Sequence, residues 1–212
     1  MKKALIVWGG WDGHQPKEVG EILRDQLLAE GYDVELSNTL DSLLDAGKLK
    51  ELSLIVPVWT MGTITREQLN GLLEAVKSGV GIAGCHGGMG DSFRMETEYQ
   101  FMVGGQWVAH PGNDGVRYTV KLGDHPIVAG IGDFEVSSEK YYMHVDPAID
   151  VLATTTFEGC GPNGADTLMP VVWTKTYGEG RVFYCSLGHQ ANIVSMPQVS
   201  TIMRRGMVWA SN

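Results

Sequence analysis

The chain has 212 residues, of which 43% are hydrophobic and 19% charged, and this is an ordinary balance for a globular protein. Its formal net charge of -9, without a cluster of lysine or arginine, argues against nucleic-acid binding, and the N-terminal apolar run stops at Gly9, too early for a signal core or a membrane span. Three widely spaced cysteines without a CxxC motif indicate a reducing compartment, so we expect a cytoplasmic protein with one domain over 1–212 and neither a membrane nor a nucleic-acid partner.

The first ninety residues alternate between strand and helix patterns. The expected strands are 4–8, 34–36, 52–59 and the apolar run after Gly79, and the expected helices begin at Pro16 and Thr65 and stop at Gly31 and Gly79. Pro57 should mark the end of the third strand, because proline cannot donate to a sheet ladder. This alternation predicts a parallel sheet with helices on both faces, where ligands bind beyond the carboxyl ends of the strands.

A glycine-rich turn, Gly84-Cys85-His86-Gly87-Gly88, follows the last of these strands. In a nucleophile elbow, glycine stands two residues before and two residues after the tip, because a bulkier neighbour would clash there. If Cys85 were the tip, the earlier flank would be Ala83, whereas with His86 as the tip both flanks are glycine. The spacing therefore favours His86 over Cys85 as the residue that faces the site, although a reactive thiol remains the alternative.

The second half has a mixture of strand, loop and helix patterns. A helix is expected over 92–103, beginning at Asp91-Ser92, and a loop over 104–111. The expected strands are 116–122, 135–142, 151–156, 169–174 and 181–186, with a loop over 159–166 and a hairpin turn at 177–180. Pro197 should open a terminal helix.

Several segments together resemble the trehalose-utilisation (ThuA-like) family, which has the class I glutamine-amidotransferase-like fold. The matching segments are 84–88, 104–111, 125–127 with 133–134, 139–141, 170–174 and 177–184 with 188–189. Ser138 departs from the pattern, because the family often has aspartate before the glutamate. The resemblance spans nearly the whole chain and implies an α/β, flavodoxin-like, doubly wound and mainly parallel sheet with an antiparallel extension.

The resemblance also implies which residues face the site. In the amidotransferases, the elbow carries a nucleophilic cysteine, and a loop after a late strand carries the histidine of the triad. His86 looks placed where that cysteine would be, and His189 where that histidine would be. A Cys–His pair makes a thiolate nucleophile, whereas two histidines can bind a divalent metal or transfer protons.

Glu139 is the best candidate carboxylate. On an alternating strand, Glu139 and Tyr141 share a face and could both point to one pocket, although a solvent-exposed face is the alternative. We therefore predict acid/base catalysis by His86 and His189 with help from Glu139, and substrate contact by Tyr141.

Two further histidines lie beside tryptophans in glycine-rich segments. His14 follows Trp11, and His110 follows Trp107, so these aromatic side chains could wall a sugar pocket. The alternative for each pair is an ordinary ordered loop or core packing.

Imidazole and carboxylate groups also suit zinc, manganese or iron. The candidate ligands are His86, His189 and His14, with Glu139, but no HExxH or HxH spacing is present, so the ligands would come from separate loops. No cofactor follows with certainty from the sequence, and a divalent transition metal such as zinc is the candidate.

Three functions remain open at this point. The first is chemistry on trehalose or a related sugar, including its keto derivatives, by histidine-based or metal-assisted catalysis. The second is a Cys85-dependent amidotransferase-like hydrolase, and the third is a non-catalytic sugar-binding module. A homo-oligomer is also open, since Met203, Met207 and Trp209 could pack at an interface or on the core.

Overall fold

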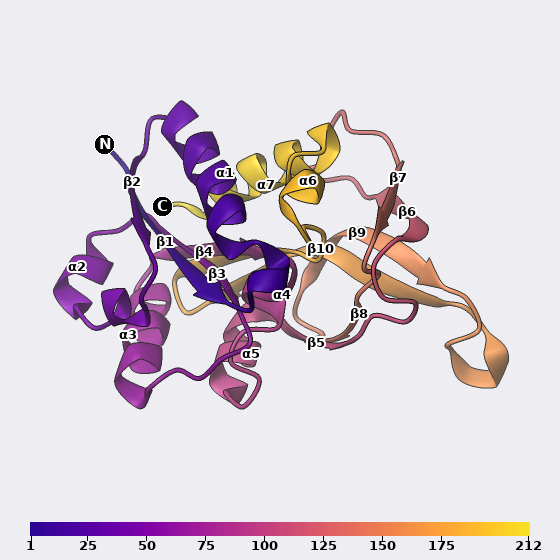
Figure 1. The fold of residues 1–212 in the computed structure, drawn as a ribbon, viewed down its shortest axis with the longest axis horizontal. Coiled ribbons are helices and arrows are strands. Elements are labelled where there is room, and N and C mark those ends of the chain that lie inside the picture. The colour runs from indigo at the N-terminus through magenta and orange to yellow at the C-terminus, as the bar shows by residue number, and fades with distance from the viewer.

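A nine-stranded sheet runs through the centre of the computed structural model, which describes residues 1–212 (Figure 1). The strand order is β2 (Asp33–Ser37), β1 (Lys3–Gly10), β3 (Leu54–Thr60), β4 (Gly81–Cys85), β11 (Gly180–Cys185), β10 (Thr167–Tyr177), β9 (Asp150–Phe157), β6 (Val116–Leu122) and β7 (Phe134–Ser138). The strands from β2 to β11 are parallel, and those from β10 to β7 continue the sheet in antiparallel fashion. The predicted fold, a doubly wound parallel sheet with an antiparallel extension, is confirmed.

Helices cover both faces of the parallel part. One face carries α1 (Pro16–Ala29), α6 (Ala191–Val194) and α7 (Pro197–Ala210), and the other carries α2 (Ala46–Lys50), α3 (Arg66–Lys77) and α5 (Thr97–Val103) (Figure 1). Successive side chains of β1 divide between the two layers: Ile6 packs in the core under α1, and Leu5 in the core under α3. None of the helices combines the length and the apolarity that crossing a bilayer requires.

The helix boundaries follow local signals in the sequence. Pro16 occupies the first turn of α1, and Gly31 follows its end with a φ of 81°. Thr65 and Gln68 form the complete capping box at the start of α3, because each side chain bonds the backbone of the other. Short 3-10 helices are η1 (Asp12–His14), η2 (Leu40–Leu43) and η3 (Pro162–Gly164).

β3 passes through Pro57, so the predicted strand end at this proline was wrong. Pro57 lies opposite Val7 of β1, and the ladder between β3 and β4 pairs only Leu54 and Ile55. Pro57 therefore lies beyond the last residue of β3 that pairs with β4. Its missing N–H leaves no carbonyl of β4 without a hydrogen-bond donor. As a result, β3 delivers Thr60 to the carboxyl edge of the sheet.

A separate two-stranded sheet contradicts two further predictions. The segment expected as a loop over 104–111 contains β5 (Gly105–Ala109), which pairs with β8 (Tyr142–Val145). The strand expected over 135–142 is instead interrupted between Ser138 and Tyr142. Within this break, Tyr118 donates a hydrogen bond from its hydroxyl to the carbonyl of Glu139, and Lys140 donates to the carbonyl of Thr156. These contacts hold residues 139–141, the crossing segment between β7 and β8, away from a regular ladder.

Candidate functional site

His86 stands at the tip of the turn that follows β4. The strand ends at Cys85, His86 has a φ of 48°, and α4 (His86–Gly90) begins at once. The helix predicted over 92–103 is therefore present only as α5 (Thr97–Val103), and the helix after the elbow begins earlier than the predicted start at Asp91. A left-handed φ is uncommon for a residue other than glycine and occurs often at functional sites. A Cβ at Gly84 would lie only 2.6 Å from the Cβ of Met89, so the tight turn requires the glycine.

Cys85 lies below this turn in the hydrophobic core. Its side chain is 3% exposed, and burial raises the pKa of its thiol far above the usual value. Cys185 is also buried, and burial raises its pKa to about 12. Neither thiol borders the cavity described below, so neither is an accessible thiolate nucleophile.

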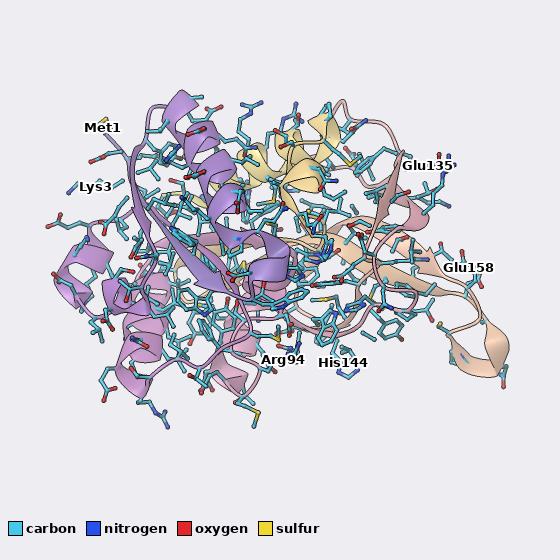
Figure 2. The ribbon with its side chains drawn as sticks, viewed as in Figure 1. Met1, Lys3, Arg94, Glu135, His144 and Glu158 are labelled. Atoms are coloured by element: carbon cyan, nitrogen blue, oxygen red, sulfur yellow. The ribbon has the colours of Figure 1, made fainter.

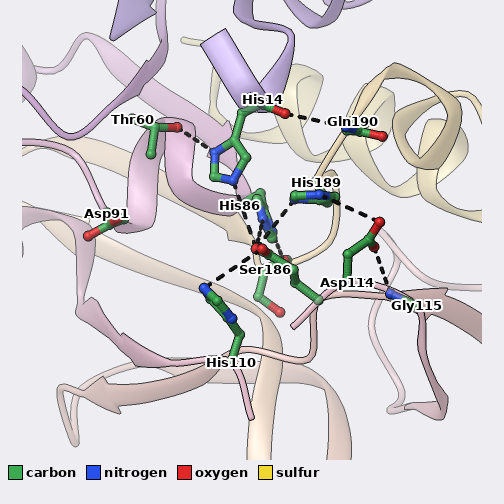
Figure 3. Close-up of polar contacts among 12 residues, drawn as sticks. His14, Thr60, His86, Asp91, His110, Asp114, Gly115, Ser186, His189 and Gln190 are labelled. Carbon is green, nitrogen blue, oxygen red and sulfur yellow. Dashed lines mark hydrogen bonds and ion pairs between the residues drawn. The ribbon is translucent and has the colours of Figure 1, made fainter. Parts of the chain in front are cut away.

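Four buried side chains meet at the carboxyl edge of the sheet (Figure 3). His14 ends η1 after β1, His86 follows β4, His189 follows β11, and Glu139 comes from the crossing segment between β7 and β8. One potential ligand atom from each lies within 4.8 Å of those of the others. The sheet thus brings together residues that are far apart in the sequence.

Three imidazole nitrogens surround one carboxylate oxygen. The distances to Oε2 of Glu139 are 3.0 Å from Nε2 of His86, 3.3 Å from Nδ1 of His189 and 3.8 Å from Nε2 of His14. His110 approaches the other carboxylate oxygen, with its Nε2 at 3.7 Å from Oε1. No lysine or arginine forms an ion pair with Glu139, although only 6% of the residue is exposed.

The hydrogen bonds of His86 determine which nitrogen carries the proton. Nδ1 lies 2.8 Å from the carbonyl oxygen of Ser186, which can only accept, so Nδ1 carries the hydrogen. Burial lowers the pKa of His86 to about 4, so the ring is neutral near pH 7 and its Nε2 presents a lone pair. That lone pair faces a carboxylate oxygen at 3.0 Å, a repulsive contact unless a cation is shared between them.

Glu139 remains ionised in this setting. Burial by itself would raise its pKa, but the polar contacts with the rings of His14 and His189 outweigh burial and hold the pKa well below its usual range. A buried carboxylate without a lysine or arginine partner is short of one positive charge.

Of the other two histidines, His14 is oriented by a neighbouring side chain. Nδ1 of His14 lies 2.8 Å from the hydroxyl oxygen of Thr60, which leaves Nε2 directed toward Glu139. Nδ1 of His189 is buried and has no hydrogen-bond partner in the protein. Histidines that bind metals usually have their second nitrogen held as Thr60 holds Nδ1 of His14, and nitrogen and carboxylate oxygen suit zinc and related metals. The donor set therefore fits a divalent transition metal.

A cavity of about 430 Å³ opens beside the cluster, which is a volume typical of small-molecule sites. Its walls are Trp11, His14, Thr60, Met61, Asp91, Arg94, Trp107, His110, Asn113, Asp114, Glu139, Tyr141 and His189. His86 itself is 1% exposed and does not border this cavity. Its ring stacks on Tyr141 with centroids 3.9 Å apart, and Tyr141 borders the cavity in its place.

The structure brings together all the residues that the sequence named for the site. Trp11, Trp107 and His110 border the cavity with Tyr141, and 28% of the His110 side chain is exposed. Glu139 and Tyr141 both border it, although they lie in the break between β7 and β8 and not on one strand face, as predicted. His189 lies across the cluster from His86, with ring centroids 5.3 Å apart.

Sequence reasoning missed five polar residues of the cavity: Thr60, Asp91, Arg94, Asn113 and Asp114. Thr60 could have been found, because it ends a parallel strand at the ligand-binding edge. The others lie in connections whose path depends on the fold, and the sequence carries no clear signal for them.

Comparison with known proteins identifies the family. Solved structures with the same fold include a ThuA-like protein from Parabacteroides merdae, with a TM-score of 0.78 at 20% identity over 99% of this chain and 89% of that one. A ThuA-like protein from Bacteroides uniformis gives 0.79 at 15% identity, covering 99% and 91% of the two chains. A cytoplasmic protein from Salmonella typhimurium gives 0.72 at 12% identity, covering 99% and 100%.

These low identities show a shared fold, and no curated protein matches the chain. Residues 3–210 match the family model described as trehalose utilisation, which covers almost the entire sequence. The chain therefore belongs to the ThuA family, as its motifs predicted.

Proposed function

We propose that this protein is an enzyme of sugar metabolism that holds a divalent transition metal, with zinc as the best fit, at His14, His86, His189 and Glu139. Its substrate would be trehalose or a related sugar, including a keto derivative. The observation that carries the metal assignment is the 3.0 Å contact between Nε2 of His86 and Oε2 of Glu139. Both atoms present lone pairs when the ring is neutral and the carboxylate ionised, and a shared cation would relieve their repulsion.

The burial of the cluster supports a metal over a mobile proton. All four side chains are buried, and three separate nitrogens are directed at the same carboxylate oxygen. A metal ion can accept a lone pair from each of these nitrogens and from the carboxylate oxygen at once. Thr60 and the Ser186 carbonyl hold two of the rings by their opposite nitrogens, as the outer partners of metal ligands do.

When bound, such a metal would polarise a carbonyl or hydroxyl oxygen of the sugar. His110 is then the residue best placed to transfer a proton, because its ring borders the cavity and is not one of the four ligands. Without a metal, His86, His189 and Glu139 would carry the acid/base chemistry themselves.

The walls of the cavity support a sugar as the ligand. Trp11 is 47% exposed beside His14, and Trp107 borders the cavity near His110. Aromatic faces pack on the apolar CH faces of sugar rings, and polar groups between them can bind the hydroxyls. The family description, trehalose utilisation, agrees with this ligand class.

Elemental analysis of the purified protein tests the metal assignment. We expect one equivalent of a transition metal in the wild type and nearly none in His86→Ala and Glu139→Gln. His144→Ala is the matched control, because His144 is an exposed histidine of β8 that points away from the molecule (Figure 2). It should retain the metal.

Removal and return of the metal completes the test. A chelator should remove the metal and lower the melting temperature, because a ligand that binds only the folded state stabilises it. Added zinc should restore both. A wild-type protein that contains no transition metal and binds no added zinc would overturn the assignment and leave the metal-free chemistry of the same histidines.

A further inference from the structure

An arginine–aspartate pair borders the cavity away from the histidine cluster. Asp91 follows α4, and Arg94 lies three residues later in the connection to α5. Asp91 and Asp114 lie on opposite sides of the cluster (Figure 3), and Arg94 also borders the cavity. Neither Asp91 nor Arg94 has a part in the proposed metal site.

The pair is rigidly built. Nε and Nη2 of Arg94 each donate to a different carboxylate oxygen of Asp91, both at 2.7 Å. Asp91 is buried, with 4% of its side chain exposed, whereas 44% of the Arg94 side chain is exposed. The guanidinium also lies over the ring of Trp107, 4.7 Å from its centroid. Arg94 is therefore held in one orientation by a buried partner and an aromatic face.

Part of this arginine remains available to a ligand. The bidentate contact uses Nε and Nη2, and Nη1 has no hydrogen-bond partner in the protein. The indole nitrogen of Trp107, in the same wall, is buried without an acceptor. An unmet buried donor is costly, so the protein alone does not complete the hydrogen bonding of this wall.

The charges of the cavity indicate what Arg94 can bind. Asp91 neutralises the arginine, and Asp114 and Glu139 add two more carboxylates to the walls, with no other lysine or arginine. Even a divalent metal on Glu139 would leave the cavity close to neutral. A neutralised guanidinium in such a cavity suits hydroxyl oxygens better than a phosphate or carboxylate group.

We propose that Arg94, held by Asp91 and Trp107, is a specificity-determining residue that donates hydrogen bonds from Nη1 to hydroxyl groups of an uncharged sugar. The sugar would span the cavity, with one part at the histidine cluster and the hydroxyls of another part at Arg94. This inference rests on the proposed function for the class of ligand, and it assigns a binding role to residues outside the metal site.

Calorimetric titration with trehalose, and separately with trehalose 6-phosphate, tests the proposal on the metal-loaded protein. We expect the wild type to bind trehalose more tightly than its phosphate. Arg94→Met should weaken trehalose binding about tenfold to hundredfold, as expected for losing hydrogen bonds to a charged donor. Arg94→Lys should also weaken it, because a single ammonium cannot reproduce the fork held by Asp91.

Arg117→Met is the matched control. Arg117 forms a similar two-pronged contact with Glu135, but that pair lies on the antiparallel extension, far from Arg94 (Figure 2). Its removal should leave trehalose affinity unchanged. Melting temperature and metal content should be measured for every variant. If Arg94→Met fails to fold because Asp91 is unpaired, the trehalose affinity of Arg94→Lys tests the role of Arg94.

The outcomes separate this proposal from the metal assignment. Wild-type affinity for trehalose in both Arg94 variants, a wild type that prefers the phosphate, or a wild type that does not bind trehalose would each overturn the role of Arg94, whatever the metal content. A protein without metal whose trehalose affinity still falls in the Arg94 variants would support Arg94 and overturn the metal assignment alone.

Discussion

Gly87 and His14 approach so closely that no other residue fits at the glycine. A Cβ on Gly87 would lie 2.7 Å from Cε1 of His14 and 2.9 Å from Cγ2 of Thr60. The first turn of α4 therefore packs directly against the ring of His14, which reaches Glu139 from η1. The glycine after the elbow tip is thus needed for the position of His14 in addition to the geometry of the turn.

Gly87→Ala should disturb the cluster more than the fold. The added methyl must displace His14 or Thr60, and overpacking of this kind typically costs about 1–3 kcal/mol of unfolding free energy. We expect weaker metal binding by titration and a lower melting temperature. Gly132→Ala is the control, because nothing lies within 4 Å of a Cβ there. Equal metal affinity in Gly87→Ala and the wild type would contradict the expected displacement of the His14 ring.

Thr60→Val tests the support of His14. Valine keeps the shape of threonine but removes the hydroxyl that lies 2.8 Å from Nδ1 of His14. Loss of an outer hydrogen-bond partner of a metal ligand typically lowers metal affinity about tenfold to hundredfold. Thr174→Val, at a buried threonine of β10 away from the cavity, should leave the affinity unchanged. Unaltered zinc affinity in Thr60→Val would contradict the proposed support of the ring.

The cysteines distinguish the metal site from thiol chemistry. A thiol reagent applied to the native protein should label Cys160, which is exposed, and leave Cys85 and Cys185 unmodified, because both are buried with raised pKa values. Mass spectrometry of the labelled peptides gives the result. Cys85→Ala should keep the metal and the affinity for trehalose, and labelling of Cys85 by a glutamine-like affinity reagent would favour the amidotransferase-like alternative.

A partly buried ion pair supports the small sheet that carries Trp107. Lys175 of β10 lies 2.6 Å from Asp146, which follows β8, and also donates to the carbonyl of Phe101. Hydrogen bonding to Lys175 lowers the pKa of Asp146 below its ordinary value. A carboxyl whose folded pKa is depressed stabilises the protein above its unfolded pKa, and this contribution disappears as the pH falls through the folded pKa.

Asp146→Asn should therefore be less stable than the wild type at neutral pH, by about 2 kcal/mol, because the ammonium of Lys175 loses its partner. The difference should narrow as the pH falls below about 4. Denaturant unfolding at several pH values measures it. Glu158→Gln is the control, since Glu158 contacts Lys140 at 3.6 Å but is 77% exposed, so its removal should change little. A difference that stays constant down to acidic pH would assign the effect to packing.

Local signals made the elbow predictable. The choice of His86 over Cys85 depended only on the residues two positions away, and a Cβ at Gly84 would indeed meet Met89. The proline rule failed at Pro57 because its consequence depends on whether the neighbouring strand continues, which is a property of the sheet. Alternation misplaced Glu139 for a similar reason, since Tyr118 and Thr156 bind the crossing segment from other strands.

The sequence by itself determined the family, the alternation of strands and helices and the place of His86 at the tip of the elbow, because propensities, caps and steric limits act between near neighbours. It also named His14, His189 and Glu139 as separate candidates. Only the tertiary structure decided that these groups share one carboxylate oxygen and that Arg94 faces the same cavity. The strand order places three histidines at one edge, and the antiparallel extension returns Glu139 to them across long separations in the chain. Such contacts depend on the packing of the whole sheet, and no spacing in the sequence encodes them.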